Sequence, residues 1–149
     1  MNKDKFPNYP YVEPDIAKLA LEFGFDWKCT HFYYAENPNE ELELKYTVYG
    51  GELYILDFNS DRDEIETDEV QFSAPTYQQV IDWLREEYSL NIRIQKALKT
   101  KDWWWSIEMI ENFLEPDNKI LRHGNHTHSD EYYDCVVESL KKAFEIIKK

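Results

Sequence analysis

The sequence contains few of the residues on which special architectures depend. Its 149 residues include two cysteines, two methionines and four glycines, and no window approaches the roughly 20 apolar residues of a membrane-spanning helix. The start, MNKDKFPNYPYVEP, lacks the apolar segment of a signal peptide. Cys29 and Cys135 lie far apart and form no Cys-x-x-Cys motif, which suits a reducing compartment better than a disulfide framework. We therefore expect a cytoplasmic protein that makes no membrane contact.

Basic side chains are also scarce, and the imbalance is uneven along the chain. The sequence has 17 Lys and Arg against 30 Asp and Glu. Residues 1–75 hold 6 basic and 17 acidic side chains, a net charge of −11, whereas residues 76–149 hold 11 and 13, a net charge of −2. Such a field repels nucleic-acid phosphates, so we expect no direct nucleic-acid binding and a basic protein as the partner.

Apolar residues are sufficient for a folded core. Hydrophobic residues make up 42% and aromatic residues 16% of the chain, and the length is that of one domain. We expect a single domain over residues 1–149, in which residues 1–11 form a loose N-terminal arm.

The periodicity of apolar residues predicts an α+β fold. Helical spacing covers residues 12–23, 76–88 and about 129–147, with Thr76 and Gln79 forming a capping box. Extended patterns cover residues 28–35, 41–49, 52–58, 90–95, 102–113 and 119–123, and an acidic loop, NSDRDEIETDE, follows Phe58. The order is therefore α-βββ-α-βββ-α, with about six strands in antiparallel meanders and three helices.

Gly50 and Gly51 predict a two-residue hairpin turn. The register then pairs Val48 with Leu53 and Tyr46 with Ile55 on one apolar face. Lys45, Thr47, Glu52 and Tyr54 lie on the other face, as a half-buried antiparallel sheet requires.

The stretch SAPTYQQVIDWLREEYSLNIRI resembles a group of small uncharacterised proteins of bacteria, prophages and other mobile elements. In that group Ala-Pro-Thr opens a helix that contains Trp-Leu-Arg, here Ala74 to Thr76 and Trp83 to Arg85. The C-terminal YYDCVVESLKKAFEIIKK is similar to the group's closing helix. The two stretches cover about a quarter of the chain. The resemblance implies a bacterial or phage cytoplasmic protein, and it brings no known activity and no catalytic residues.

The segment RHGNHTHSDE carries the densest set of metal-ligand side chains. Neutral imidazoles and a carboxylate are suitable zinc ligands, so His123, His126, His128 and Asp130 could form a mononuclear zinc site. The His-x-His-x-Asp spacing is that of metallo-β-lactamase-type hydrolases, but no histidine follows His128 and Glu131 stands where that pattern has His. The alternative is a polar loop in which Ser129 caps the last helix, without a cofactor.

Two further patterns are weaker. Asp57, Asn59, Asp61 and Asp63 alternate as oxygen ligands do in a calcium loop, but Arg62 stands where the turn needs glycine. Cys29 and His31 share a strand face, as a nucleophile and its base would, yet no third group or oxyanion-hole motif accompanies them. Because no Gly-rich phosphate loop, GxSxG or HExxH is present, we expect no catalytic residues.

The surplus aromatic and acidic residues suggest a binding surface instead. In the run Trp103 to Trp105, a strand sends Trp104 to the opposite face, where it packs under another element or anchors a partner. Glu41 and Glu43 would lie about 7 Å apart on one strand face, which is comparable with phosphate spacing. The candidate partner-binding residues are Glu41, Glu43, Tyr49, Tyr54, Asp61, Asp63, Glu64 and Trp104.

Two functions remain open. The first is a non-enzymatic acidic interaction module that binds, and by DNA mimicry could inhibit, a basic or nucleic-acid-binding protein. The second is a small metal-dependent hydrolase built on residues 123–130, with a zinc-activated water.

Overall fold

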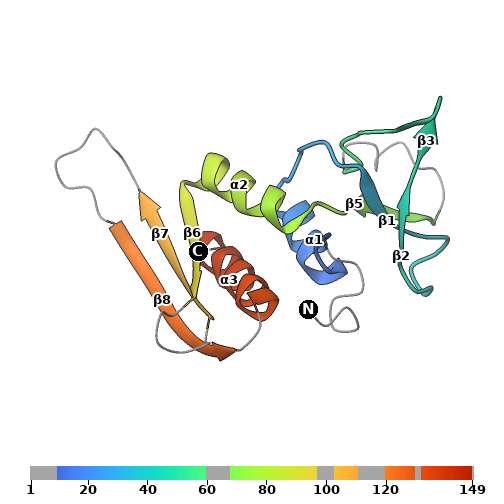
Figure 1. The fold of residues 1–149 in the computed structure, drawn as a ribbon. Coiled ribbons are helices and arrows are strands. Elements are labelled where there is room, and N and C mark those ends of the chain that lie inside the picture. Colours follow the sequence, from blue (N-terminus) through green and yellow to red (C-terminus); the bar gives the residue numbers. More distant parts are fainter. Residues whose placement is uncertain (1–9, 60–67, 97–102, 111–119, 130–131, 149) are drawn as a thin grey trace. The chain divides into compact units, whose positions relative to one another are not determined.

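The fold belongs to the α+β class, as predicted. A computed structural model describes residues 10–59, 68–96, 103–110, 120–129 and 132–148 (Figure 1). Within these ranges three helices accompany small antiparallel sheets, in an order close to the predicted one. Contacts group the described residues into two compact units, one ending at Val80 and the other beginning at Ile81. The prediction of one domain stays a prediction, and residues 1–9 of the expected arm lie outside the described ranges.

The first helix, α1 (Pro14–Glu22), forms as its sequence predicts. Pro14 occupies the first helical position, where its missing N–H costs no hydrogen bond. Gly24 ends the helix with a φ of +90°, a conformation that side chains with a Cβ rarely adopt. The helix buries its apolar face through Ile16, Ala17 and Ala20.

The first unit contains a three-stranded antiparallel sheet in the order β2-β1-β5. The central strand, β1 (His31–Ala35), pairs with β2 (Glu43–Tyr46) on one side and with β5 (Val70–Ser73) on the other. Tyr33 is fully buried, and its hydroxyl donates a 2.6 Å hydrogen bond to the carbonyl of Val12, just before α1. Strand β5 is not among the predicted strands, because the predicted acidic loop is followed directly by the second helix.

The capping box at the start of α2 (Tyr77–Tyr88) is confirmed. The backbone N–H of Gln79 donates to Oγ1 of Thr76 at 3.1 Å, and the N–H of Thr76 donates to the Gln79 side chain at 2.9 Å. These two bonds satisfy amide groups that the first turn of a helix leaves without partners. The Gln79 amide also donates to the carbonyl of Lys28 at 3.1 Å.

The second unit packs a helix on a meander. β6 (Leu90–Lys96), β7 (Trp103–Ile110) and β8 (Ile120–Ser129) form an antiparallel sheet in the order β6-β7-β8. Helix α3 (Tyr132–Ile147) contacts this sheet. The buried side chains of the strands and the helix form the core; they are Leu90, Ile92, Trp105, Ile107, Cys135, Val136, Leu140, Ala143 and Phe144.

The boundary between β8 and α3 corrects the sequence analysis. The predicted strand ended near His123 and was followed by a polar loop, with the helix starting at about Ser129. In the structure β8 continues to Ser129 and α3 begins at Tyr132. Pairing with β7 keeps this polar sequence extended, although its residues have little intrinsic preference for strands.

The unit boundary also separates the charge. No charged residue lies between positions 75 and 81, so the unit that ends at Val80 carries the net charge of −11 and the other carries −2. None of the helices within the described ranges has the length and apolar composition needed to cross a lipid bilayer.

Candidate functional site

The most distinctive surface of the first unit is a short hairpin formed by β3 (Val48–Tyr49) and β4 (Glu52–Leu53). Gly50 and Gly51 have φ values of +62° and +83°, so both turn residues adopt the left-handed conformation of a type I′ turn. Val48 pairs with Leu53 and Tyr49 with Glu52, as the sequence predicts. The N–H of Tyr54 donates to the carbonyl of Thr47 at 2.8 Å, which extends the same register by one pair.

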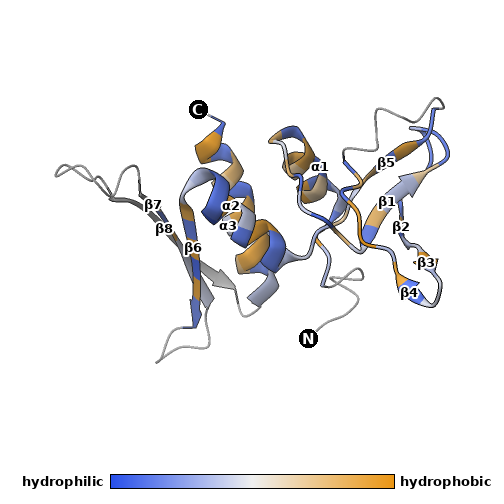
Figure 2. Ribbon diagram, turned by 90° about the horizontal axis from the view of Figure 1, so that it is seen from above, coloured by the Kyte–Doolittle hydropathy of each residue, from blue (hydrophilic) through white to orange (hydrophobic). Residues whose placement is uncertain are grey.

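The hairpin is exposed, which corrects the prediction of a buried apolar face. Tyr49 is 81% exposed, and Tyr46, Val48, Leu53, Tyr54 and Ile55 are between 46% and 59% exposed. Among the described residues, the other exposed large apolar side chain is that of Tyr132. Figure 2 shows hydrophobic residues in orange on both β3 and β4. The alternating pattern was right, but within the described ranges these side chains remain exposed.

Both ends of the hairpin are attached near the start of β1. Tyr46 pairs with His31, and their ring centroids lie 5.3 Å apart. The register described for the hairpin extends to Thr47 and Tyr54, so the predicted pairing of Tyr46 with Ile55 stays a prediction. After the hairpin, Leu56 forms a bridge with Cys29 through hydrogen bonds of 2.7 Å and 3.1 Å. These contacts fix the base of the hairpin on the sheet.

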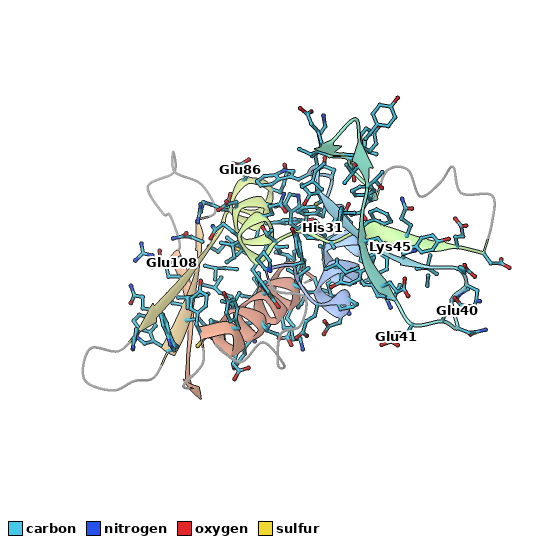
Figure 3. All side chains as sticks on the ribbon, turned by 45° about the vertical axis from the view of Figure 1, so that its right-hand side comes forward. His31, Glu40, Glu41, Lys45, Glu86 and Glu108 are labelled. Atoms are coloured by element: carbon cyan, nitrogen blue, oxygen red, sulfur yellow. The ribbon has the colours of Figure 1, made fainter. Side chains whose placement is uncertain are left out.

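The hairpin itself carries little charge, although its unit is strongly acidic. Glu52 is the one charged residue between Tyr46 and Ile55, in a unit whose net charge is −11. Figure 3 shows Glu40 and Glu41 near the end of β2 that is farther from the hairpin, with Lys45 between them and the hairpin. The apolar surface of the hairpin therefore contains one carboxylate, that of Glu52, and belongs to a unit with a strongly negative net charge.

The predicted row of carboxylates is interrupted, as the sequence indicated. Glu43 is exposed on β2, and its carboxylate lies 3.7 Å from the ammonium group of Lys45. The same ammonium group lies 4.3 Å from the ring centroid of Tyr34, at cation–π distance. A hydrogen bond with Glu69 raises the pKa of the Tyr34 hydroxyl. On this face of the sheet the ammonium group of Lys45 is thus in contact with both the Glu43 carboxylate and the Tyr34 ring.

Asn59 uses its side chain to hold the unit together. Its Nδ2 donates to the carbonyl of Phe25 at 2.9 Å, and its Oδ1 accepts from the N–H of Ser73 at 2.9 Å. Its own N–H donates to the carboxylate of Asp57 at 3.0 Å. Asn59 therefore joins its own segment to those of Phe25 and Ser73. Its Oδ1, the atom that would bind calcium in the predicted loop, already accepts the hydrogen bond from Ser73. Asp61, Asp63 and Glu64 lie outside the described residues.

The histidine-rich segment lies in β8, with His123 opposite Ile107 and with an irregular pairing between Asn125 and Ser129. The side chains of His123, His126 and His128, and the whole of Asp130, lie outside what the structure describes. No group of three or more potential metal ligands occurs among the side chains that it does describe. The zinc site stays a prediction.

The environment of Cys29 explains why it is a poor nucleophile. The side chain is buried, and burial raises the pKa of the thiol from 9.0 to about 12. Its Sγ donates to the carbonyl of Trp27 at 3.6 Å. The neighbouring His31 directs Nδ1 toward the hydroxyl of Thr30, 2.8 Å away. The thiol therefore stays protonated at neutral pH.

Trp104 belongs to the second unit and lies on β7 beside the buried Trp105. It pairs with Gln95 of β6 and is half-buried. The predicted binding residues are therefore divided: Glu41, Glu43, Tyr49 and Tyr54 belong to the first unit, and Trp104 belongs to the second.

Four exposed residues of the hairpin are not among the predicted binding residues: Tyr46, Val48, Leu53 and Ile55. Their alternation was read as a buried face, because alternation identifies a strand face without identifying what covers it. The expected strands, residues 41–49 and 52–58, were long enough to belong to a larger sheet, whereas the strands of the hairpin in the structure have two residues each. A two-stranded hairpin has little core of its own.

A comparison with family models, with curated proteins and with solved structures finds no match for this chain.

Proposed function

We propose that this protein is a non-enzymatic interaction module that binds a basic protein partner through the hairpin of residues 46–55. One observation carries the proposal: six large apolar side chains are exposed together within ten consecutive residues. Scattered exposed apolar residues are ordinary, but a contiguous patch marks an interaction surface.

The energetics support binding at this position. Full burial of one aliphatic or aromatic side chain contributes about 1.5–3 kcal/mol, and these six side chains are about half exposed. Covering all of them would contribute about 5–10 kcal/mol before the cost of association. Tyrosine is also enriched among the residues that dominate binding energy at interfaces, and Tyr49 is the most exposed of the six.

The charge distribution supports a basic partner. Stable interfaces commonly have an uncharged centre and a polar rim. Here the hairpin carries only Glu52, while the unit around it has a net charge of −11. A basic surface would be attracted over a distance of about 8–10 Å at physiological salt. The same charge would let the protein compete with nucleic acid for that surface, and so inhibit a nucleic-acid-binding partner.

The metal-dependent hydrolase remains a prediction from the sequence. Its ligands, His123 to Asp130, have no described side-chain geometry, so no structural observation favours it over the binding function.

The test is affinity capture by the tagged full-length protein from a bacterial lysate, at low and at moderate salt, with mass spectrometry of the retained proteins. We expect a basic protein to be retained and its capture to weaken as the salt concentration rises. The double variant Tyr49→Ser, Tyr54→Ser should reduce capture about tenfold or more, since it removes two exposed aromatic contacts.

The matched control is Tyr132→Ser, which removes an exposed tyrosine from the other unit. Capture should persist in this control, provided that circular dichroism shows it to be folded. Equal capture by the wild type and the hairpin variant, or capture that is unchanged from low to high salt, would contradict the proposal.

A further inference from the structure

The hairpin presents apolar side chains on both of its faces. Neighbouring positions along a strand alternate between faces, and directly paired residues share one. Val48 and Leu53 are a direct pair and occupy the first face. Tyr49 and Tyr54 belong to the neighbouring pairs and therefore occupy the second face. All four side chains are exposed.

A hairpin that lies flat against a partner covers one face and leaves the other in water. Flat binding would explain exposed apolar residues on one side, with polar residues on the other, as in an ordinary half-buried sheet. In this hairpin the second face carries the most exposed aromatic side chain, Tyr49, and Tyr54 as well. Flat binding would leave either the aliphatic pair or the two tyrosines exposed.

We infer that the hairpin inserts into a cleft of its basic partner, so that an apolar wall contacts the face with Val48 and Leu53. The opposite wall, which combines apolar and basic groups, contacts the face with Tyr49, Tyr54 and Glu52. This inference rests on the proposed function and deepens it. Charge complementarity selects the occupant: a second copy of this chain would bring another unit with a net charge of −11 against the first.

The tip and the base of the hairpin suit insertion. Gly50 and Gly51 have no side chains, and no other atom lies within 4 Å of the position of a Cβ at either residue. The leading end is therefore thin. At the base, the pairing of Tyr46 with His31 and the bridge between Leu56 and Cys29 hold the hairpin on the sheet, which lowers the ordering cost on binding.

The test places a photo-cross-linking amino acid, p-benzoylphenylalanine, singly at positions 48, 49, 53 and 54 of the full-length protein. Each variant is irradiated in a bacterial lysate, and the cross-linked peptides are identified by mass spectrometry. We expect positions 48 and 53 to cross-link to one segment of a basic protein, and positions 49 and 54 to a second segment of the same protein. The same substitution at the exposed Asn39, in the turn before β2, serves as the control and should give no cross-link to that protein.

Substitutions on each face provide an independent measurement with the cross-linked protein once it is purified. Val48→Ser with Leu53→Ser, and Tyr49→Ser with Tyr54→Ser, should each raise its Kd about tenfold or more. Because all four positions are exposed, the variants should keep the circular dichroism spectrum of the wild type.

Other results would separate the inference of insertion from the proposed binding of a basic protein. Cross-links or losses of affinity confined to one face would overturn insertion and leave a flat hairpin contact. Cross-links to a second copy of the chain would overturn the choice of occupant. Capture of a basic protein without any hairpin cross-link would overturn this inference but leave a binding function elsewhere. Failure to capture any basic protein would count against the proposed function itself.

Discussion

The rings of Tyr11 and His31 are stacked, with their centroids 4.0 Å apart and their planes inclined by 28°. Tyr46, which pairs with His31 from strand β2, has its ring centroid 5.3 Å from that of the imidazole. His31 therefore connects the segment before α1 with the strand that leads into the hairpin. Tyr11 also forms a bridge with Thr76, so the chain is held in place just before the first helix.

The stacked position of His31 predicts a shift in its titration. Burial lowers the pKa of His31 below 6.5, because water stabilises the protonated imidazole better than this site does. The contribution of the neutral His31 side chain to the stability of the fold is complete above pH 6.5. It is lost as the pH falls through the lowered pKa, because the unfolded chain binds the proton more readily. NMR titration should give a pKa below 6.5, and Tyr11→Ala should raise it by uncovering the ring. An unchanged pKa in Tyr11→Ala would show that Tyr11 does not cause the burial.

Removal of the hairpin should leave the fold intact. Tyr46 and Leu56 each lie one strand spacing, about 5 Å, from residues 29–31, so the gap between them is at most about 18 Å. A five-residue Gly/Ser linker in place of residues 47–55 spans up to about 20 Å. We expect the free energy of unfolding to change by no more than about 1 kcal/mol. Urea denaturation measures it, with Trp83→Ala as the contrasting variant.

Trp83 is fully buried in α2, so its truncation should cost about 3–5 kcal/mol. A comparable loss on hairpin replacement would mean that the hairpin supports the core, contrary to its exposure.

Asn59 should be more important for stability than an asparagine in an exposed turn. Asn59→Ala removes the hydrogen bonds to Phe25 and Ser73 and should cost about 2 kcal/mol. Asn37→Ala is the matched control, because its side chain forms two bonds at the surface, with Asn39 and Glu40. That change should cost about 0.5 kcal/mol or less. Chemical denaturation of both variants tests the difference, and equal losses would contradict the structural role of Asn59.

The Cys29 thiol should react slowly in the native protein. With a pKa of about 12 instead of 9.0, the fraction of thiolate at a given pH is lower by on the order of 1,000-fold. The contribution of the buried Cys29 thiol to the stability of the fold is complete below pH 9 and is lost as the pH rises toward 12. The reason is that the thiol of the unfolded chain releases its proton at a lower pH than the thiol of the native protein. Labelling with a disulfide reagent at pH 8 measures the rate, with the Cys29→Ser variant reporting Cys135 alone. Rapid native labelling that disappears in Cys29→Ser would refute the burial.

Local chemistry made several elements predictable. Pro14 and Gly24 mark the two ends of α1, and the capping box marks the start of α2, because each involves interactions between residues close in sequence. The Gly-Gly turn determined the register of the hairpin for the same reason. Strand β5 was missed because it is only four residues long, Val70 to Ser73, and because it depends on pairing with β1, which is distant in sequence.

The site was only partly predictable, because exposure depends on the whole fold. Tyr49 and Tyr54 were predicted as partner contacts, and both are exposed. Val48 and Leu53 alternate as buried strand residues would, and the sequence cannot reveal that both side chains are exposed in the structure. The continuation of β8 through the histidine-rich segment likewise depends on the neighbouring strand β7, which overrides weak local preference.

The exposed hairpin also sets a limit on how the protein can be handled. Strands with open edges and exposed apolar side chains are sites of edge-to-edge aggregation, and mutual repulsion between like-charged molecules opposes it. At neutral pH the net charge of −13 provides that repulsion, but it vanishes near the isoelectric point of about 4.7. Acidification toward that pH should therefore precipitate the wild-type protein sooner than the version with the Gly/Ser linker. In this sense the acidic composition acts as a colloidal stabiliser for a surface that would otherwise aggregate.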